Sequence, residues 1–480
     1  MKKVLLTGVA LMLAGGVAAP VFAADATPGF TVTGDARMRM YYKSDEYANT
    51  FGNSLVPNGS SVAAGSQTNM DTRIRFDLTG TAAGGAYVKG RIRMMESTMS
   101  AMDTDLNGIN GQNQNNIWAD KAYMGVPITK DITIEVGKYR STYGPLPTTY
   151  NFFYDDVQLA GARGIIKIGD VVINPFFEWM TDGQNSGITS SNAAQTSSTT
   201  DKANDNDEMR MGAHVKAKLN KDWTIGGMLG YQMDNRVDTA TATGNQGAFG
   251  SIYVNGTAGA FGIVGELAYT AAKLNGFNTW AEDANVNGTF GSFNTTTGTT
   301  GTEATQDMIG SKNDGYGGYI NPTFTIDKLT LGVNAGFTKN GFRPDVAYGF
   351  VMIGGKDNSI IGDSVRIGET GDWLWAGLSA TYAISNDLKV TGNFVYADVD
   401  SVDITSAGAV TAMKAGQGDV PYTTAKALDS AYELSAIMQY TISKGADLFL
   451  SAGYLKPDFT NPALKTDAAL GVASRLEIAF

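Results

Sequence analysis

Polar and apolar residues alternate one by one along many short segments of the chain. The segment "RIRFDL", residues 73–78, has a charged residue at every second position, and "YVKGRIRM", residues 87–94, repeats this pattern. Because successive side chains of a β-strand point to opposite faces, each segment predicts a strand with one charged and one apolar face. A strand of this kind needs water on one side only.

Eighteen segments predict strands, and the connections between them alternate in length. The predicted strands are residues 30–43, 70–81, 86–96, 117–128, 132–139, 162–169, 171–180, 208–219, 223–233, 248–258, 260–272, 314–326, 329–339, 371–384, 388–399, 430–442, 446–455 and 468–480. Every second connection is short, such as "AAGG", "GD" and "DK", and carries the Gly, Asn or Asp typical of hairpin turns. The others are long and polar. Short turns at one end and long loops at the other are typical of an outer-membrane barrel.

The faces of the predicted strands decide which side of the sheet meets lipid. In residues 208–219, Met209 and Met211 share one face, and Arg210 and Lys216 share the other. A bilayer offers no water to backbone groups, so a spanning sheet must close on itself. A charge at the lipid midplane costs roughly 2–4 kcal/mol per Arg or Lys, which places the charged face toward a hydrated lumen.

We therefore predict an all-β fold: a transmembrane antiparallel β-barrel of 18 strands, with short periplasmic turns and long extracellular loops. A soluble all-β repeat protein is the alternative, but it would not need the strict alternation of short and long connections.

The first residues have the pattern of a secretory signal. Lys2 and Lys3 precede the apolar run "VLLTGVALMLAGGVAA", and the tripeptide that ends at Ala23 fits a small-x-small cleavage rule. We predict that residues 1–23 are a cleaved signal peptide and that residues 24–480 form a single barrel domain in the bacterial outer membrane. A membrane anchor is the alternative, but the run is shorter than the ~18 residues of a spanning helix.

Composition removes several classes of function. The 480 residues contain no cysteine, which excludes thiolate metal sites and the Cys-x-x-Cys-His attachment of haem. A formal net charge of −11 argues against a nucleic-acid partner. The single histidine, His214, lies on a predicted lumen face, and no neighbouring strand supplies a nucleophile and base to go with it. We predict no enzymatic activity, no cofactor and a solvated lumen position for His214.

The segment "DTDLNGINGQNQ", residues 103–114, partly matches the calcium-loop pattern. Asp103, Asp105 and Asn107 are weak candidates for ligands, but the twelfth position is Gln114, where the pattern requires Glu. An extracellular polar loop is the preferred interpretation, and no metal site is predicted.

Aromatic residues near strand ends are expected to form girdles at the membrane interfaces, although burial in an ordinary core would explain each one singly. They are Tyr42, Trp118, Trp179, Trp223, Trp373 and Trp375. Two predicted strands contain a proline, at Pro175 and Pro322, which removes a ladder hydrogen bond and predicts bulges there.

The last predicted strand, "GVASRLEIAF", ends with Phe480 and alternates as the others do. In this it resembles outer-membrane barrel proteins, and the resemblance implies that Phe480 is part of the signal read by the barrel-assembly machinery.

The segments "AYMGV" and "VGKYRSTYG", joined by a tight turn, resemble the general porins of Gram-negative bacteria. In that family the third loop folds into the lumen, and its acidic residues face a basic cluster on the wall. The resemblance implies an inward loop at about Ser141–Ala160, with Asp155 and Asp156 as its acids. The implied wall cluster is Arg37, Arg39, Arg73, Arg75, Lys89, Arg91 and Arg93, with Arg163 and Lys167 as lesser candidates.

The resemblance also implies a homotrimer in contact with outer-membrane lipid and lipopolysaccharide. The chain departs from the family in two ways. General porins have sixteen strands, which is the alternative count here, and the third loop has "GPLPTTYNFFYDD" in place of the Pro-Glu-Phe-Gly-Gly run of enterobacterial members. Eighteen strands are more typical of substrate-selective channels.

The predicted function is passive diffusion of small hydrophilic solutes and ions through a water-filled pore with a charged constriction. The alternatives are a channel selective for anions or sugars, and a barrel sheath for a periplasmic or extracellular cytochrome partner. In another interpretation the arginines are solvated lumen residues that pair with acids such as Asp35, Asp77 and Glu135. Net charge favours cations and the arginines favour anions, so ion preference stays open.

Overall fold

The structure is a computed structural model of the chain. It describes residues 27–45, 65–98, 117–146, 151–153, 157–181, 208–234, 238–239, 242–243, 247–271, 314–340, 342, 344, 348–354, 365–368, 371–401, 428–459 and 468–480. All structural statements below concern these residues.

Eighteen long strands form one antiparallel sheet. They are β1 (Gly29–Asp45), β2 (Gly65–Thr81), β3 (Tyr87–Thr98), β4 (Ile117–Pro127), β5 (Ile132–Ser141), β6 (Val157–Ile168), β7 (Val171–Thr181), β8 (Glu208–Lys218), β9 (Trp223–Asp234), β12 (Gly247–Ala258), β13 (Phe261–Thr270), β14 (Gly315–Ile326), β15 (Leu329–Lys339), β18 (Gly371–Ala383), β19 (Leu388–Ser401), β20 (Leu428–Ser443), β21 (Ala446–Phe459) and β22 (Ala469–Ala479). The eighteen predicted strands are confirmed, and the described residues contain eighteen barrel strands, not the alternative sixteen. Each is long enough to cross a bilayer, which takes about 9–11 tilted residues.

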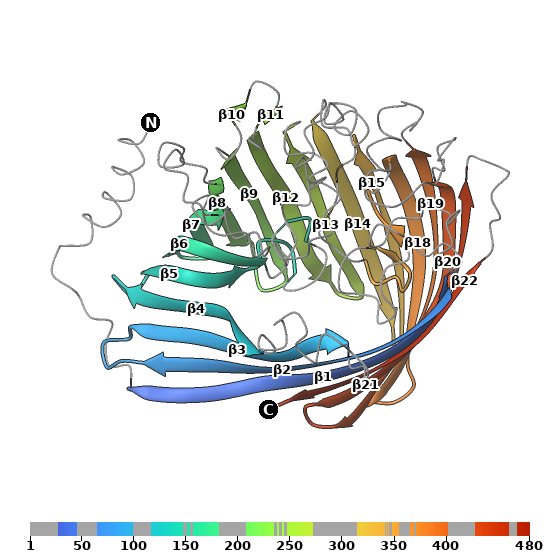
Figure 1. Cartoon of the computed structure of the whole chain (residues 1–480), viewed down its shortest axis with the longest axis horizontal. Helices are drawn as coiled ribbons and strands as arrows, with labels where there is room; N and C mark the ends of the chain where they lie inside the picture. The colour runs from blue at the N-terminus through green and yellow to red at the C-terminus, as the bar shows by residue number, and fades with distance from the viewer. Residues whose placement is uncertain are drawn as a thin grey trace, which may run out of the picture.

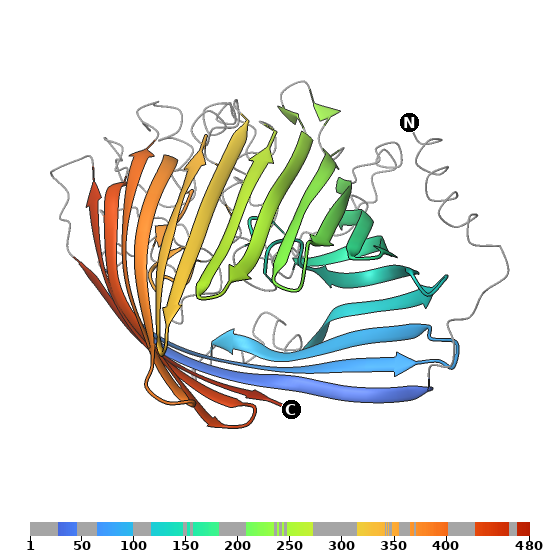
Figure 2. The same ribbon diagram turned by 180° about the vertical axis from the view of Figure 1, so that it is seen from behind.

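The sheet closes into a barrel. Each long strand pairs with the next one along the chain, and β1 also pairs with β22. At this seam the backbones of Gly34 and Phe480 exchange two hydrogen bonds, with N to O distances of 2.8 and 2.9 Å. Figure 1 shows the strands following one another in order of colour, from β1 in blue to β22 in red, which returns to the side of β1. Figure 2 shows the same sheet from behind.

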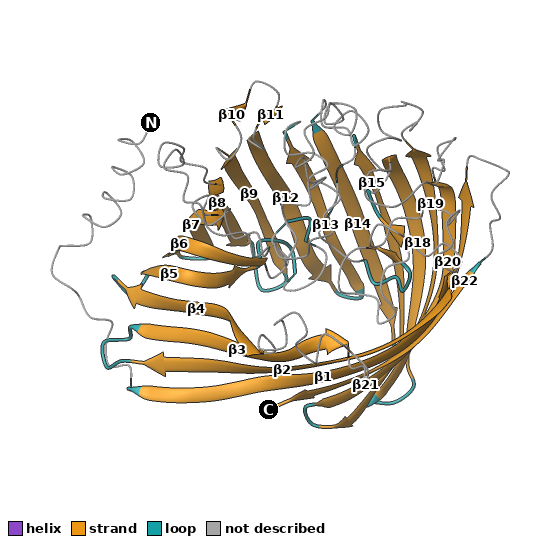
Figure 3. Ribbon diagram, in the orientation of Figure 1, coloured by secondary structure: helices purple, strands orange, loops and turns teal. Residues whose placement is uncertain are grey.

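Tight turns join the strands at one end of the barrel. Gly169, Gly259 and Asp327 occupy the turns after β6, β12 and β14 with φ of 58°, 60° and 51°, the left-handed conformation that a two-residue hairpin turn requires. The strand ends that border the long connections all lie at the other end of the barrel (Figure 3). Among the described residues, no helix has the length and apolar content needed to cross a membrane.

Two short strand pairs were not predicted. β10 (Asp238–Thr239) pairs with β11 (Ala242–Thr243), and β16 (Ile353–Gly354) pairs in parallel with β17 (Val365–Arg366). Both pairs lie in long connections, where the sequence has no alternating pattern.

The outer face of the barrel is apolar. Large exposed hydrophobic side chains recur at every second position, such as Met38 and Met40 in β1 and Leu331 and Val333 in β15. Exposed aromatic residues occur near both ends of the strands. Toward the long loops they are Tyr42, Trp179, Tyr231, Tyr269, Tyr316, Tyr396 and Tyr432, and toward the short turns they are Phe30, Phe261, Phe324, Tyr382, Tyr440 and Phe480. These two rings match the girdles expected of a membrane barrel.

The assignment of Trp373 and Trp375 to a girdle is wrong. Each is only 1% exposed, and both lie on the inner face of β18. The Trp375 indole nitrogen donates to Asn334 Oδ1 at 2.7 Å, so the ring is fixed inside the barrel.

The predicted bulges at the strand prolines are also wrong. The pairing of β14 with β15 resumes in the same register on either side of Pro322, and the pairing of β6 with β7 does the same around Pro175. Each proline removes ladder contacts locally without adding a residue to its strand.

Candidate functional site: a charged wall facing two inward segments

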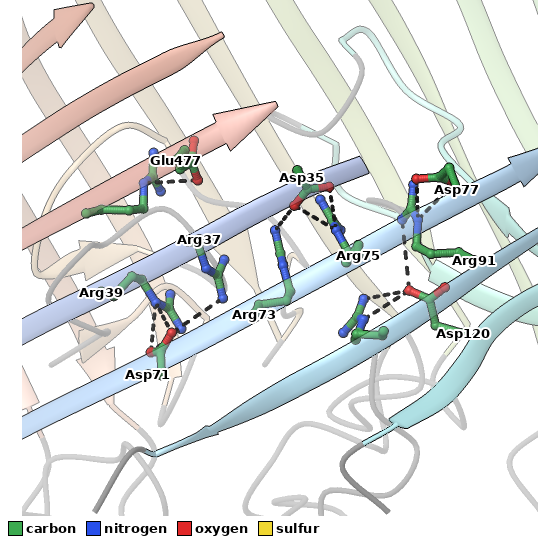
Figure 4. A network of polar contacts seen from close by, with 12 residues as sticks. Asp35, Arg37, Arg39, Asp71, Arg73, Arg75, Asp77, Arg91, Asp120 and Glu477 are labelled. Carbon is green, nitrogen blue, oxygen red and sulfur yellow. Dashed lines mark hydrogen bonds and ion pairs between the residues drawn. The ribbon is translucent and has the colours of Figure 1, made fainter. Parts of the chain in front are cut away.

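Ionisable side chains line the inner face of β1 to β4 in an unbroken row. We call this row the charged wall, and Figure 4 shows most of it. Its members are Asp35, Arg37, Arg39, Asp71, Arg73, Arg75, Asp77, Arg91, Arg93, Asp120 and Lys121. The alternation of β1, β2 and β3 places their arginines on the face opposite to the apolar outer residues.

Between β1 and β2, each aspartate bridges two arginines. Asp71 accepts from Arg39 Nε at 2.9 and 3.0 Å and lies 3.9 Å from Arg37 Nη2. The antiparallel register places Asp35 opposite Arg75, and Arg75 Nε donates to both carboxylate oxygens of Asp35 at 2.9 and 3.0 Å.

The second pair of aspartates continues the row across β3 and β4. Asp77 accepts from Arg91 Nε at 3.0 and 3.1 Å and also contacts Lys121. Asp120 is fully buried and accepts from Arg93 Nε at 3.0 Å and Arg140 Nη1 at 3.1 Å. Asp120 occupies a bulge, because Arg91 pairs with Lys121 while the next residue of β3 pairs with Ala119.

The charged wall carries an excess of positive charge. With Arg140 included, eight cations (Arg37, Arg39, Arg73, Arg75, Arg91, Arg93, Lys121 and Arg140) contact four carboxylates (Asp35, Asp71, Asp77 and Asp120), which leaves a net charge of +4. Parts of the row remain accessible: Arg75 is 17% and Asp35 28% exposed. Fixed charges beside a low-dielectric wall produce strong local fields.

The remaining predicted wall cations lie at the margin of this row or outside it. Lys89 Nζ lies 5.0 Å from the centre of the Tyr87 ring. Arg163 on β6 donates from Nε to Glu135 Oε2 at 2.5 Å and from Nη1 to Ser141 Oγ at 3.0 Å. Lys167 is exposed beside the short turn that follows β6, so it does not belong to the charged wall.

Three of the pairs match the interpretation in which the arginines are balanced by neighbouring acids: Arg75 with Asp35, Arg91 with Asp77, and Arg163 with Glu135. These arginines are therefore both paired with acids and partly exposed to the lumen. Asp155 and Asp156 lie outside the described residues, as do Asp103, Asp105 and Asn107. Within the described ranges, no group of three or more His, Cys, Asp or Glu side chains could hold a metal ion.

The described residues of the third loop fold inward, as predicted. We call residues 142–146 and 151–153 the first inward segment. Asn151, Phe152 and Phe153 are fully buried. The Phe152 amide donates to Glu266 Oε2 on β13 at 2.8 Å, and the Pro145 carbonyl accepts from the Asn255 side chain on β12 at 3.2 Å. The loop that starts after β5 is thus held by strands more than 100 residues later in the chain.

A second part of the chain also folds inward, and the sequence did not predict it. We call residues 342, 344, 348–354 and 365–368, which include β16 and β17, the second inward segment. Its buried side chains include Phe342, Phe350 and Met352. They cover the inner face of β18 to β21, where Val395 and Leu455 are fully buried.

The two inward segments meet in one aromatic cluster. The Phe152 ring lies 5.4 Å from the Phe342 ring and 6.5 Å from the Tyr348 ring, measured between centroids. Tyr348 in turn lies 5.0 Å from Trp375. One side of the lumen is therefore filled by apolar contacts, while the other side keeps the charged wall.

His214 is not solvated, contrary to the prediction. Its side chain is buried, and its Nε2 lies 2.8 Å from the Tyr253 hydroxyl. The ring stacks on Tyr143 of the first inward segment at 4.8 Å. His214 therefore helps to support the third loop.

Sequence reasoning missed several residues of this site. Asp71 and Lys121 lie within predicted strands on the charged face, so the alternation alone would have placed them there. Asp120 was hidden by its bulge, which shifts the alternation by one residue. Glu266 and Glu433 carried no visible signal, because a single carboxylate on a lumen face looks like any solvated lumen residue.

No family model and no curated protein matches the chain. Among solved structures, OccK8 (OprE) of Pseudomonas aeruginosa aligns over 94% of this chain and 98% of its own, with 10% identity and a TM-score of 0.49. The outer membrane channel DcaP of Acinetobacter baumannii aligns over 95% of this chain and 100% of its own, with 13% identity and a TM-score of 0.43. OmpT, an outer membrane protein of Vibrio cholerae in its trimer form, aligns over 94% of this chain and 100% of its own, with 10% identity and a TM-score of 0.39.

Proposed function

We propose that the protein is an outer-membrane channel for the passive diffusion of small hydrophilic solutes and ions. An apolar outer face between two aromatic rings suits a bilayer, and a row of ionisable groups on the inner face needs water. A cleaved signal peptide, assembly through Phe480 and a homotrimer remain predictions that accompany this proposal.

One observation carries the proposal: the lumen is divided between a charged wall and an apolar filling. The two inward segments cover the inner face of β18 to β21, whereas Arg75 and Asp35 of the charged wall stay partly exposed. The aqueous path therefore runs along β1 to β4. Asp155 and Asp156 keep their proposed role as the acids that face this wall.

The second candidate function is selectivity for anions. Each aspartate of the charged wall contacts at least two cations, and the wall together with Arg140 has an excess of four positive charges. An anion that passes along the wall exchanges part of its hydration for guanidinium contacts, which bind carboxylate and phosphate groups well. The sheath alternative required a wide and unplugged lumen, and the two inward segments argue against it.

Recordings in planar bilayers test both candidates. The purified protein is expected to form channels whose reversal potential, in a tenfold salt gradient of about 0.1 to 1 M, lies on the anion-selective side. Vesicles loaded with sugars of increasing size would then give the size limit. A protein that inserts without conducting would overturn the channel proposal, and a cation-selective reversal potential would overturn the second candidate only.

A further inference from the structure

A single carboxylate fixes the tip of the second inward segment. Glu433 on β20 is fully buried. Its Oε1 accepts from the Val351 amide at 2.7 Å, and its Oε2 accepts from the Met352 and Ile353 amides at 2.8 and 2.7 Å. Three consecutive backbone amides thus converge on one charged group. Hydrogen bonds to a charged acceptor are the stronger kind, and a buried carboxylate without them would be costly.

Side chains of the same segment pack directly against glycines of the barrel wall. A Cβ atom on Gly377 of β18 would lie 2.7 Å from the Phe350 ring, and one on Gly317 of β14 would lie 2.7 Å from the Phe342 ring. A Cβ atom on Gly453 of β21 would lie 2.9 Å from Met352 Sδ. A side chain at any of these places would require the Phe350, Phe342 or Met352 side chain to shift. Three strands are therefore shaped to receive it.

The contacts of the segment have a consequence for the lumen. The inner face beneath it is largely apolar, with Trp373, Val395, Ala397 and Leu455 each at most 1% exposed. If the segment moved away, this face would border the aqueous path and the free cross-section would increase. The position of residues 351–353 therefore determines how much of the lumen is open.

We propose that Glu433 is the positioning residue of the second inward segment and, through it, sets the width and the solute size limit of the channel. The width statement rests on the proposed function. The positioning statement does not, because it concerns only where residues 351–353 lie.

The positioning statement is tested by chemical labelling. The chain has no cysteine, so Val351→Cys introduces a single thiol at a position that is 1% exposed. With Glu433 present, a water-soluble maleimide should react slowly. In the Glu433→Ala background the thiol should react at least about tenfold faster, since local opening controls access to a buried group. Equal labelling rates in the two backgrounds overturn the positioning role, whether or not the protein conducts.

The width statement is tested with the same glutamate in bilayers and vesicles. Glu433→Ala should raise single-channel conductance and admit larger sugars, and Glu433→Gln, which keeps one acceptor oxygen, should give an intermediate value. Glu477→Ala is the matched control, because it removes a lumen carboxylate that pairs with Arg475 on β22 and does not hold either inward segment. The control should keep the size limit of the wild type.

A second variant separates position from charge. Gly377→Leu places a side chain where the Phe350 ring packs and leaves Glu433 unchanged. It should raise single-channel conductance, as Glu433→Ala does. If both variants label faster but the size limit does not change, the width statement fails while the positioning statement stands. If wild type and control do not conduct, the proposed channel function fails.

Discussion

The inner surface of the barrel has two regions that follow the same sequence rule and end in opposite environments. On β1 to β4, the inner face is the charged wall and stays partly exposed. On β18 to β21, the inner face carries Trp373, Trp375, Val395 and Leu455, and the second inward segment buries it. We call this region the covered wall. Alternation along a strand therefore determines which face is inside, whereas the loops determine whether that face meets water.

The energetic basis of the two regions differs as well. The covered wall is stabilised by apolar burial and close packing, which are costly to disturb. The charged wall is stabilised by ion pairs whose value depends on how deeply each is buried. The predictions below test this difference, in order of decreasing effect.

The largest effect is expected on the covered wall. Trp375→Ala should lower the free energy of unfolding by about 3–5 kcal/mol, because it leaves a cavity beneath the second inward segment and removes the partner of Asn334. Urea titration of the barrel in lipid vesicles, followed by circular dichroism, measures the loss. Trp179→Ala is the matched control, since that indole is 43% exposed on the outer face. Equal losses for the two variants would contradict the comparison.

A smaller effect is expected where the charged wall is buried. Asp120→Asn should cost about 3 kcal/mol of unfolding free energy, because it leaves the guanidinium groups of Arg93 and Arg140 without their carboxylate. Asp35→Asn should cost less than about 1 kcal/mol, because Asp35 is 28% exposed and water compensates for the loss. The same urea titration applies. The idea of a burial gradient along the wall fails if the order of the two losses is reversed.

The smallest effect concerns selectivity. Arg75→Glu should lower the anion-to-cation permeability ratio about fivefold, since two unit charges at 4 Å interact with about 1 kcal/mol in water. Lys167→Glu makes the same change of charge beside a short turn, outside the charged wall, and should have little influence. Reversal potentials in a salt gradient give both ratios. A shift of the same size in the two variants would show that total charge, rather than the charged wall, sets the selectivity.

Much of the fold follows from the sequence because barrel strands obey local rules. Lipid outside and water inside impose an alternation with a period of two, and hairpin turns need Gly, Asn or Asp. Strand positions were therefore predictable to within a few residues, with differences of up to five at the starts of β2 and β6. The shared face of the arginines of β1, β2 and β3 follows from the same alternation.

The interior was less predictable because it depends on contacts between distant segments. Trp373 and Trp375 looked like girdle residues by their place near a strand end. They share a face with Ser379 and Thr381, which was the available signal that they point inward. What covers them is the second inward segment, described at residues 342, 344, 348–354 and 365–368, whose sequence has no periodicity. The role of Glu433 likewise depends on backbone amides some 80 residues away, and amides leave no trace in the sequence.

The seam between β1 and β22 determines when the barrel is complete. Gly34 and Phe480 are 446 positions apart, and bringing such distant partners together costs on the order of 5 kcal/mol in chain entropy. Contacts of this separation form late. Until then the sheet has two free edges with unpaired amides and carbonyls, ready to join another chain. The nascent protein is therefore most prone to aggregate just before its ring closes, and the barrel depends most on assistance at that step.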